Sequence, residues 1–215
     1  MISKKNLLRR SRIYLLLDKG VARGRPLDGI LKELIRTKDI EIIQFRDKLA
    51  GKRQLLKEAG LVKEKLRDTG KIFILNDHPD VALAVDADGL HIGQDDIPLG
   101  LARRIMGEDK LIGISCHNLR QAITAQKNGA DYISVGPIFA TSTKPEYRPI
   151  GLKLIKDLKR RIRLPFFLIG GIDRSNIGDI AKLGIKRFAV CKAILKRNNI
   201  AQAAHQLKSI ITDPR

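Results

Sequence analysis

The chain has 215 residues, of which 43% are hydrophobic and 30% charged, and its formal net charge is +19. This is the composition of a globular protein, and no apolar run approaches the roughly 18 residues of a membrane span, so a disordered chain and a membrane-spanning one are both excluded. The two cysteines lie far apart in sequence, which excludes a disulfide framework and favours a cytoplasmic location.

After a basic N-terminal extension over residues 1–12, short apolar and β-branched runs recur at intervals of roughly 20 to 30 residues. Strands are expected at 13–17, 41–46, 72–77, 89–93, 111–116, 132–138, 166–171 and 187–194, the last run (RFAVCKAI) passing into a helix. Between most of them, apolar residues at three- and four-residue spacing predict helices, and IAQAAHQLKSII predicts a closing one.

This alternation predicts a parallel sheet in a single domain over residues 1–215, although the length would also allow two small domains. Eight strands are the number that closes a (β/α)8 TIM barrel, and the chain is at the compact end for that fold. The alternative is an open doubly wound sheet, which usually carries a glycine-rich turn after its first strand. The segment LLLDKGVARGRP lacks that spacing. We therefore predict an α/β protein with a TIM barrel.

In such a barrel the carboxyl ends of the strands meet at one mouth, where catalysis takes place. The polar residues and glycines at those ends indicate a site for phosphates with a divalent metal: Gln44, Arg46, Lys48, Asn76, Asp77, Gln94, Asp95, Asp96, Ser115, His117, Thr141, Thr143, Lys144, Gly170, Gly171 and Lys192.

The run QFRDK ends the second strand. Residues two apart share a strand face, so Gln44, Arg46 and Lys48 project together. An arginine fork and a lysine point charge suit a diphosphate. Taken alone, the run fits equally well a solvated strand end in which Asp47 is the partner of these cations.

Two carboxylates end neighbouring strands, Asp77 in ILNDHPD and Asp96 in HIGQDD. Mg²⁺ prefers one or two carboxylates together with water and substrate phosphates, so this pair favours a magnesium site. Aspartates also cap helices, which is the interpretation we favour for Asp80 and Asp95.

Two later loops carry anion-binding signals. In GPIFATSTKPE, Thr141 and Thr143 can donate to phosphate oxygens and Lys144 supplies charge, although a flexible Ser/Thr loop is the alternative. In IGGID, Gly170 and Gly171 let the backbone approach an anion near a helix N-terminus, where a phosphate commonly sits in this fold.

Lys192, near the end of an apolar run, costs energy unless its ammonium finds water or an anion. His117 is a candidate acid or base, but the histidines form no ligand set and no Ser-His-Asp constellation can be assembled. Cys116 and Cys191 are expected to be buried small hydrophobes.

Four stretches together resemble the thiamine phosphate synthase family: QFRDK, NDHPDVALAVDADGLHIGQDD, IGISCHNLRQAITAQKNGADYISVGPIFATSTKP and IGGIDRSNI. The resemblance covers about residues 13 to 195. It implies a Mg²⁺-dependent transferase that joins 4-amino-2-methyl-5-(diphosphooxymethyl)pyrimidine to 4-methyl-5-(2-phosphooxyethyl)thiazole, giving thiamine phosphate and pyrophosphate. Pyrophosphate would leave first, and the thiazole nitrogen would attack the resulting pyrimidine carbocation.

The resemblance also implies roles for individual residues. The pyrimidine diphosphate would be held by Gln44, Arg46, Lys48, Asn76, Ser115 and Lys144. Mg²⁺ would be held by Asp77 and Asp96. The thiazole and its phosphate would be held by Thr141, Thr143, Gly171, Cys191 and Lys192. Arg46, Lys48, Ser115 and Lys144 are expected to be catalytic, because negative charge builds up on the departing diphosphate.

One residue departs from the family pattern, since a serine usually stands where this chain has Lys192. Lysine either replaces a hydroxyl donor with a charge or obstructs the thiazole phosphate site. A thiazole tautomerase-like isomerase, kept open by His117, and a non-catalytic phosphate-ligand-binding barrel are the alternative functions.

The basic surface also raises nucleic acid as a partner, because a protein this basic binds polyanions at low salt. However, acidic residues are interleaved, as in KEAGLVKEKLRD, and aromatic residues make up only 4% of the chain. Anionic small-molecule substrates or work at high temperature explain such a surface as well. We expect phosphorylated small molecules as partners and neither a specific nucleic acid nor a membrane, and we leave a homo-oligomer open.

Overall fold

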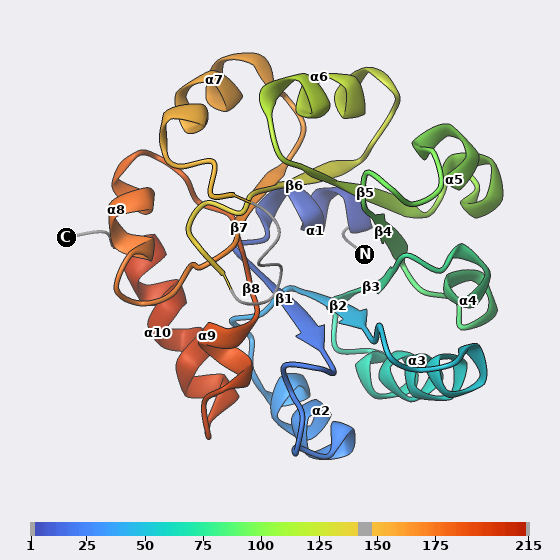
Figure 1. Cartoon of the computed structure of the whole chain (residues 1–215). Helices are drawn as coiled ribbons and strands as arrows, with labels where there is room; N and C mark the ends of the chain where they lie inside the picture. The colour runs from blue at the N-terminus through green and yellow to red at the C-terminus, as the bar shows by residue number, and fades with distance from the viewer. Residues whose placement is uncertain (1–2, 142–147, 214–215) are drawn as a thin grey trace.

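The computed structural model describes residues 3–141 and 148–213, and within them eight parallel strands close a barrel in chain order. Helices surround the strands, as the view in Figure 1 shows. The strands are β1 (Ile13–Asp18), β2 (Ile42–Arg46), β3 (Ile72–Asn76), β4 (Gly89–Ile92), β5 (Leu111–Cys116), β6 (Tyr132–Val135), β7 (Phe166–Ile169) and β8 (Phe188–Val190). The TIM barrel predicted from the alternation of strands and helices is therefore confirmed.

The helices include α1, which precedes the first strand, and α9, a single turn that directly follows the last one. The bounds are α1 (Lys4–Arg10), α2 (Leu27–Arg36), α3 (Lys52–Leu66), α4 (Pro79–Ala84), α5 (Leu99–Met106), α6 (Leu119–Lys127), α7 (Lys153–Arg161), α8 (Ile177–Lys182), α9 (Lys192–Leu195) and α10 (Ile200–Thr212). Among the described residues, no helix is both long and apolar enough to cross a membrane.

Barrel closure follows from the strand sequences, whose residues alternate between two apolar environments. One set, including Leu15 and Phe45, packs against the surrounding helices in the larger core cluster. The other set, including Tyr14, Ile42 and Phe167, fills the barrel interior. β1 pairs with both β2 and β8, so this sheet has no free edge.

Helix α1 closes the amino-terminal end of the barrel. Leu8 on α1 is 2% exposed and belongs to the interior cluster with Tyr14 and Ile42. The end at which the strands begin is thereby sealed, and the opposite end carries the mouth that the sequence predicts as the site.

Candidate active site

A cavity of about 450 Å³ opens at the carboxyl ends of the strands, a volume in the usual range for small-molecule sites. Its walls include most of the residues predicted from the strand ends: Gln44, Arg46, Lys48, Asn76, Asp77, Asp96, Ser115, His117, Thr141, Gly170, Gly171 and Lys192. Cys191, which only the family resemblance assigned to the site, lines it as well. Thr143 and Lys144 lie outside the described residues. Gln94 and Asp95 are exposed and do not line this cavity.

The end of β2 supplies the cations, and its alternation is as predicted. Gln44 and Arg46 face the cavity, whereas Phe45 is fully buried in the outer core. In the part of the chain that the structure describes, Asp47 forms no ion pair with these cations, and its Oδ1 instead accepts the backbone N–H groups of Leu49 and Ala50 at 3.0 and 3.1 Å. Asp47 therefore stabilises the turn after β2, while the side chains of Arg46 and Lys48 line the cavity.

Each cation has a carboxylate partner from a neighbouring strand end. Arg46 forms an ion pair with Asp18, the last residue of β1, whose side chain is 5% exposed. The other oxygen of that carboxylate, Oδ1, accepts the N–H of Val21 at 3.0 Å. Lys48 forms an ion pair with Asp77. The Arg46 guanidinium is thus held by a buried, hydrogen-bonded carboxylate, whereas the side chain of Lys48 is half exposed.

Asp77 and Asp96 meet at the mouth, as their positions on adjacent strands predict. Burial and the neighbouring Asp96 carboxyl raise the pKa of Asp77, although the Lys48 ammonium acts in the opposite direction. The Asp96 Oδ2 accepts the N–H of Gly93 at 2.6 Å, and Asp77 has a left-handed backbone with φ of 64°. Such a conformation is uncommon for residues other than glycine, although aspartate adopts it more readily than most.

Two adjacent carboxylates form a donor set suited to a hard divalent cation, which would relieve the repulsion between them. Within residues 3–141 and 148–213, His, Cys, Asp and Glu form no cluster of three or more that could hold a metal. Two carboxylates with water and phosphate oxygens are, however, the sparse set that Mg²⁺ accepts.

On the opposite side of the cavity, glycines bring the loops after β6 and β7 together. A Cβ on Gly171 would lie 2.6 Å from the Ala140 carbonyl oxygen and 2.7 Å from Phe139 Cβ, and its φ is 63°. The Asn176 side chain donates to the Gly171 carbonyl at 2.8 Å. A side chain at this position would push away the loop that carries Thr141.

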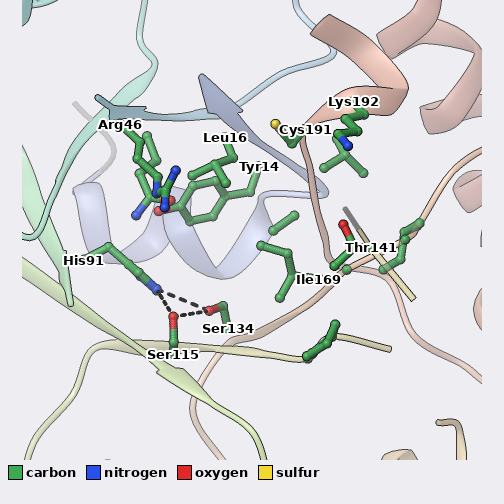
Figure 2. A pocket seen from close by; sticks show the side chains of 18 of the residues that line it. Tyr14, Leu16, Arg46, His91, Ser115, Ser134, Thr141, Ile169, Cys191 and Lys192 are labelled. Carbon is green, nitrogen blue, oxygen red and sulfur yellow. Dashed lines mark hydrogen bonds between the residues drawn. The ribbon is translucent and has the colours of Figure 1, made fainter. Parts of the chain in front are cut away.

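Lys192 begins α9 and lines the cavity beside Cys191. Figure 2 shows Lys192 and Thr141 on one side of the pocket and Arg46 and His91 on the other. The cavity therefore has a basic side chain at each of two separate ends, Arg46 at one and Lys192 at the other, which suits a reaction between two anionic ligands. Cys191 is only partly buried, so the expectation of a buried cysteine is met fully by Cys116 alone.

Burial raises the pKa of the Cys191 thiol to about 12, with the nearby Asp18 acting in the same direction. A thiol in that state is a poor nucleophile at neutral pH. His117, the candidate acid or base, lies in the cavity wall with its Nδ1 2.6 Å from the Gly136 carbonyl oxygen.

Sequence reasoning missed Asp18, which pairs with Arg46, and several polar residues that line the cavity, among them His91, Ser134, Lys196 and Arg197. Asp18 ends an apolar run, and its partner Arg46 lies on another strand. His91 and Ser134 are 6% and 4% exposed within strands. The signal available in the sequence was the alternation of side-chain direction along β4 and β6, because it directs His91 and Ser134 into the barrel interior.

A closed parallel barrel whose strand ends bring cations, a carboxylate pair and glycine loops around one cavity defines a class of proteins, the TIM-barrel enzymes that bind anionic substrates. The comparisons narrow this class to one family. The family model described as thiamine monophosphate synthase matches residues 13–194. The chain belongs to this family, and it is an enzyme of the transferase type.

Individual relatives agree with the family match. The chain is 42% identical to a thiamine-phosphate synthase of Chloroflexus aurantiacus, across 94% of this chain and 93% of that protein. It is 41% identical to one of Shouchella clausii, across 91% and 94% of the two chains. The solved structure of a thiamine phosphate pyrophosphorylase from Pyrococcus furiosus superposes with a TM-score of 0.86 at 29% identity, covering 97% and 99% of the two chains.

Proposed function

We propose that this transferase joins 4-amino-2-methyl-5-(diphosphooxymethyl)pyrimidine to 4-methyl-5-(2-phosphooxyethyl)thiazole, yielding thiamine phosphate and pyrophosphate. The observation that carries the proposal is the placement of Arg46 and Lys48 beside the Asp77–Asp96 pair in one cavity, with the basic side chain of Lys192 at the other end. Both proposed substrates are anionic, and each would occupy one of these two ends.

In this reaction the bond between the methylene carbon and the diphosphate oxygen breaks, and the thiazole nitrogen lone pair forms the new C–N bond. Arg46 and Lys48 hold the diphosphate and stabilise the charge that develops on it. Gln44 and Asn76, whose side chains are hydrogen bonded at 3.2 Å, hold the pyrimidine, and Ser115 donates to the same substrate. Lys144 is assigned to the diphosphate from the family resemblance.

Asp77 and Asp96 would hold Mg²⁺, which when bound would neutralise part of the diphosphate charge. Thr141, Thr143, Gly171 and the backbone at Cys191 and Lys192 would hold the thiazole phosphate. No general base is required, because the attacking ring nitrogen carries no proton. That agrees with the absence of a catalytic triad in the sequence.

The testing experiment incubates the purified chain with both precursors and MgCl₂ and measures pyrophosphate and thiamine phosphate. We expect equal amounts of the two products, and none when EDTA replaces the metal. Absence of pyrophosphate would contradict the proposal, and interconversion of thiazole carboxylate tautomers in its place would support the isomerase alternative.

The metal assignment is tested by Asp96→Ala, which we expect to lower kcat/KM at least a hundredfold at saturating Mg²⁺, because one of two carboxylate ligands is removed. Asp95→Ala is the matched control, since Asp95 is the adjacent, exposed carboxylate and should retain activity within about twofold. Unchanged turnover in Asp96→Ala would show that the metal site is assigned wrongly.

A further inference from the structure

A chain of hydrogen bonds crosses the barrel interior and ends at the cavity. The hydroxyls of Tyr14 and Tyr132 are 2.9 Å apart, and the Tyr132 hydroxyl lies 3.1 Å from Nδ1 of His91. On the other side of the imidazole, Nε2 lies 3.1 Å from Ser115 Oγ and 3.2 Å from Ser134 Oγ. Figure 2 shows His91, Ser115 and Ser134 converging at the edge of the pocket.

The barrel is built around these side chains. Tyr14 and Tyr132 are 2% and 0% exposed, and their rings pack edge-on against Phe167. A Cβ at residue 113 would lie 2.0 Å from the Tyr132 ring, so the glycine on β5 leaves the space that this ring occupies. The tyrosine has no room to turn away from His91 without unpacking the interior.

Among the described residues, counting the donors and acceptors of this network favours one arrangement of its hydrogen atoms. Burial raises the pKa of both tyrosines, so both hydroxyls keep their protons at neutral pH. Within the described residues, the Tyr14 hydroxyl has the Tyr132 oxygen as its hydrogen-bond partner, so Tyr14 donates to Tyr132. Tyr132 must then donate to Nδ1 of His91, because an unpaired buried O–H is costly.

The same counting continues beyond the imidazole. With Nδ1 accepting, neutral His91 carries its proton on Nε2 and donates toward the two serine hydroxyls. The buried Ser134 hydroxyl cannot donate to a protonated Nε2, so it donates to Ser115 Oγ at 3.3 Å. Ser115 thus accepts from two groups, and its own hydrogen is directed to the cavity that it lines.

We propose that Tyr14, Tyr132 and His91 are positioning residues that fix Ser115 as a hydrogen-bond donor to the bound ligand. The ligand must present an acceptor there, and in the proposed function, on which this part rests, it is an oxygen of the departing diphosphate. The bond from Ser115 strengthens as negative charge develops on that oxygen, so the network acts on the transition state more than on substrate binding.

The first test needs no substrate. The chain has four histidines, and ¹⁵N-histidine labelling with two-dimensional NMR reports which ring nitrogen of each carries the proton. The His91 signals are assigned by their loss in His91→Gln. We expect a neutral His91 with its proton on Nε2, and a proton on Nδ1 would overturn the proposal.

Two buried tyrosine variants make a matched pair for this measurement. Tyr132→Phe removes the donor to Nδ1, so we expect His91 to lose its single tautomer. In Tyr14→Phe, Tyr132 still has Nδ1 as its acceptor, so the tautomer should stay as in the unaltered chain. A general effect of deleting a buried hydroxyl would appear in both variants, and the same tautomer in both would count against the proposal.

Kinetics then test whether the network acts through Ser115. Tyr132→Phe should lower kcat about tenfold, the effect of losing one buried hydrogen bond, with little change in the KM for the pyrimidine diphosphate. In the Ser115→Ala background the same change should have little further effect, whereas additive losses would overturn the proposal. If the unaltered chain released no pyrophosphate, the proposed function would fail while the NMR result would still decide the network.

Discussion

The resemblance to the family implies a serine where this chain has Lys192, and the structure places Lys192 in the cavity wall at the start of α9. If that expectation holds, the ammonium group adds a charge in place of a hydroxyl, and charge-assisted hydrogen bonds are about twice as strong as neutral ones. The same side chain is also longer than serine. Lys192 therefore either strengthens the binding of the thiazole phosphate or reduces the space available for it.

We expect Lys192→Ser to raise the KM for the thiazole phosphate about tenfold and to leave the KM for the pyrimidine diphosphate unchanged, because one charged contact is lost. Steady-state kinetics with each substrate varied in turn measure both constants. Lys186→Ser is the control, since Lys186 is exposed on the loop before β8 and does not line the cavity. A gain in activity in Lys192→Ser would show that the lysine obstructs the site.

Asp18 is the second residue whose role follows from one contact. Its buried carboxylate anchors Arg46, whose side chain is 16% exposed. Asp18→Asn keeps the shape but removes the charge, so we expect kcat/KM for the pyrimidine diphosphate to fall about tenfold, as a misplaced guanidinium would cause. Asp157→Asn, at an exposed pair on α7, should have no effect. Unchanged kinetics in Asp18→Asn would mean that Arg46 needs no anchor.

At the scale of elements, the sequence predicted most of the site because strand ends in a barrel converge. Arg46, Asp77, Asp96 and Ser115 were all placed at the mouth by that rule alone, and the structure gathers them in one cavity. Asp18 could not be predicted, because the last residue of an apolar run gives no sign of its cross-strand partner. The hydrogen-bond network of Tyr14, Tyr132 and His91 could not be predicted either, since a single polar residue in a buried strand resembles an ordinary core position.

Strand boundaries were less predictable than strand positions. The run expected at 132–138 ends as a strand at Val135, because the chain turns at Gly136, where a Cβ would lie 2.1 Å from the Ile169 carbonyl oxygen. The run at 187–194 divides into β8 and α9, as its predicted passage into a helix requires. Such ends depend on contacts with other strands that local sequence does not contain.

The loop contact at Gly171 gives a prediction at this scale. Gly171→Ala should destabilise the fold by about 2–4 kcal/mol, from an unfavourable positive φ and overlap with the 139–140 loop, and should raise the KM for the thiazole phosphate. Denaturant unfolding and kinetics measure the two effects. Gly129→Ala has a similar φ of 84° with open space around it, so it should cost only about 1–2 kcal/mol and leave the KM unchanged. Equal behaviour of the two variants would contradict the role of the loop contact.

At the scale of the whole molecule, the barrel has one open end because α1 covers the other. Besides Leu8 in the interior cluster, α1 is tied to the barrel by Lys4 with Asp88 at 3.3 Å and by Lys5 with Asp131 at 3.4 Å. These lysines are about half exposed, so the ion pairs contribute little and the buried leucine contributes most. The sequence predicts residues 1–12 as a basic extension because the segment is rich in lysine and arginine. A single buried leucine is too weak a sequence signal to predict a packed helix there.

Leu8→Ala tests whether this segment stabilises the barrel. If α1 is part of the packed interior, truncating a side chain that is 2% exposed should lower the free energy of unfolding by about 2–5 kcal/mol, through lost burial and the cavity that remains. Urea unfolding followed by circular dichroism measures the change. Leu49→Ala is the matched control, because Leu49 is 89% exposed and its truncation should change stability by about 0.5 kcal/mol or less. A loss in Leu8→Ala as small as that of the control would show that residues 1–12 behave as an extension that the barrel does not need. A large loss of unfolding free energy with an unchanged KM for both substrates would show that α1 affects stability alone. That is the result expected for a helix at the end of the barrel opposite the cavity.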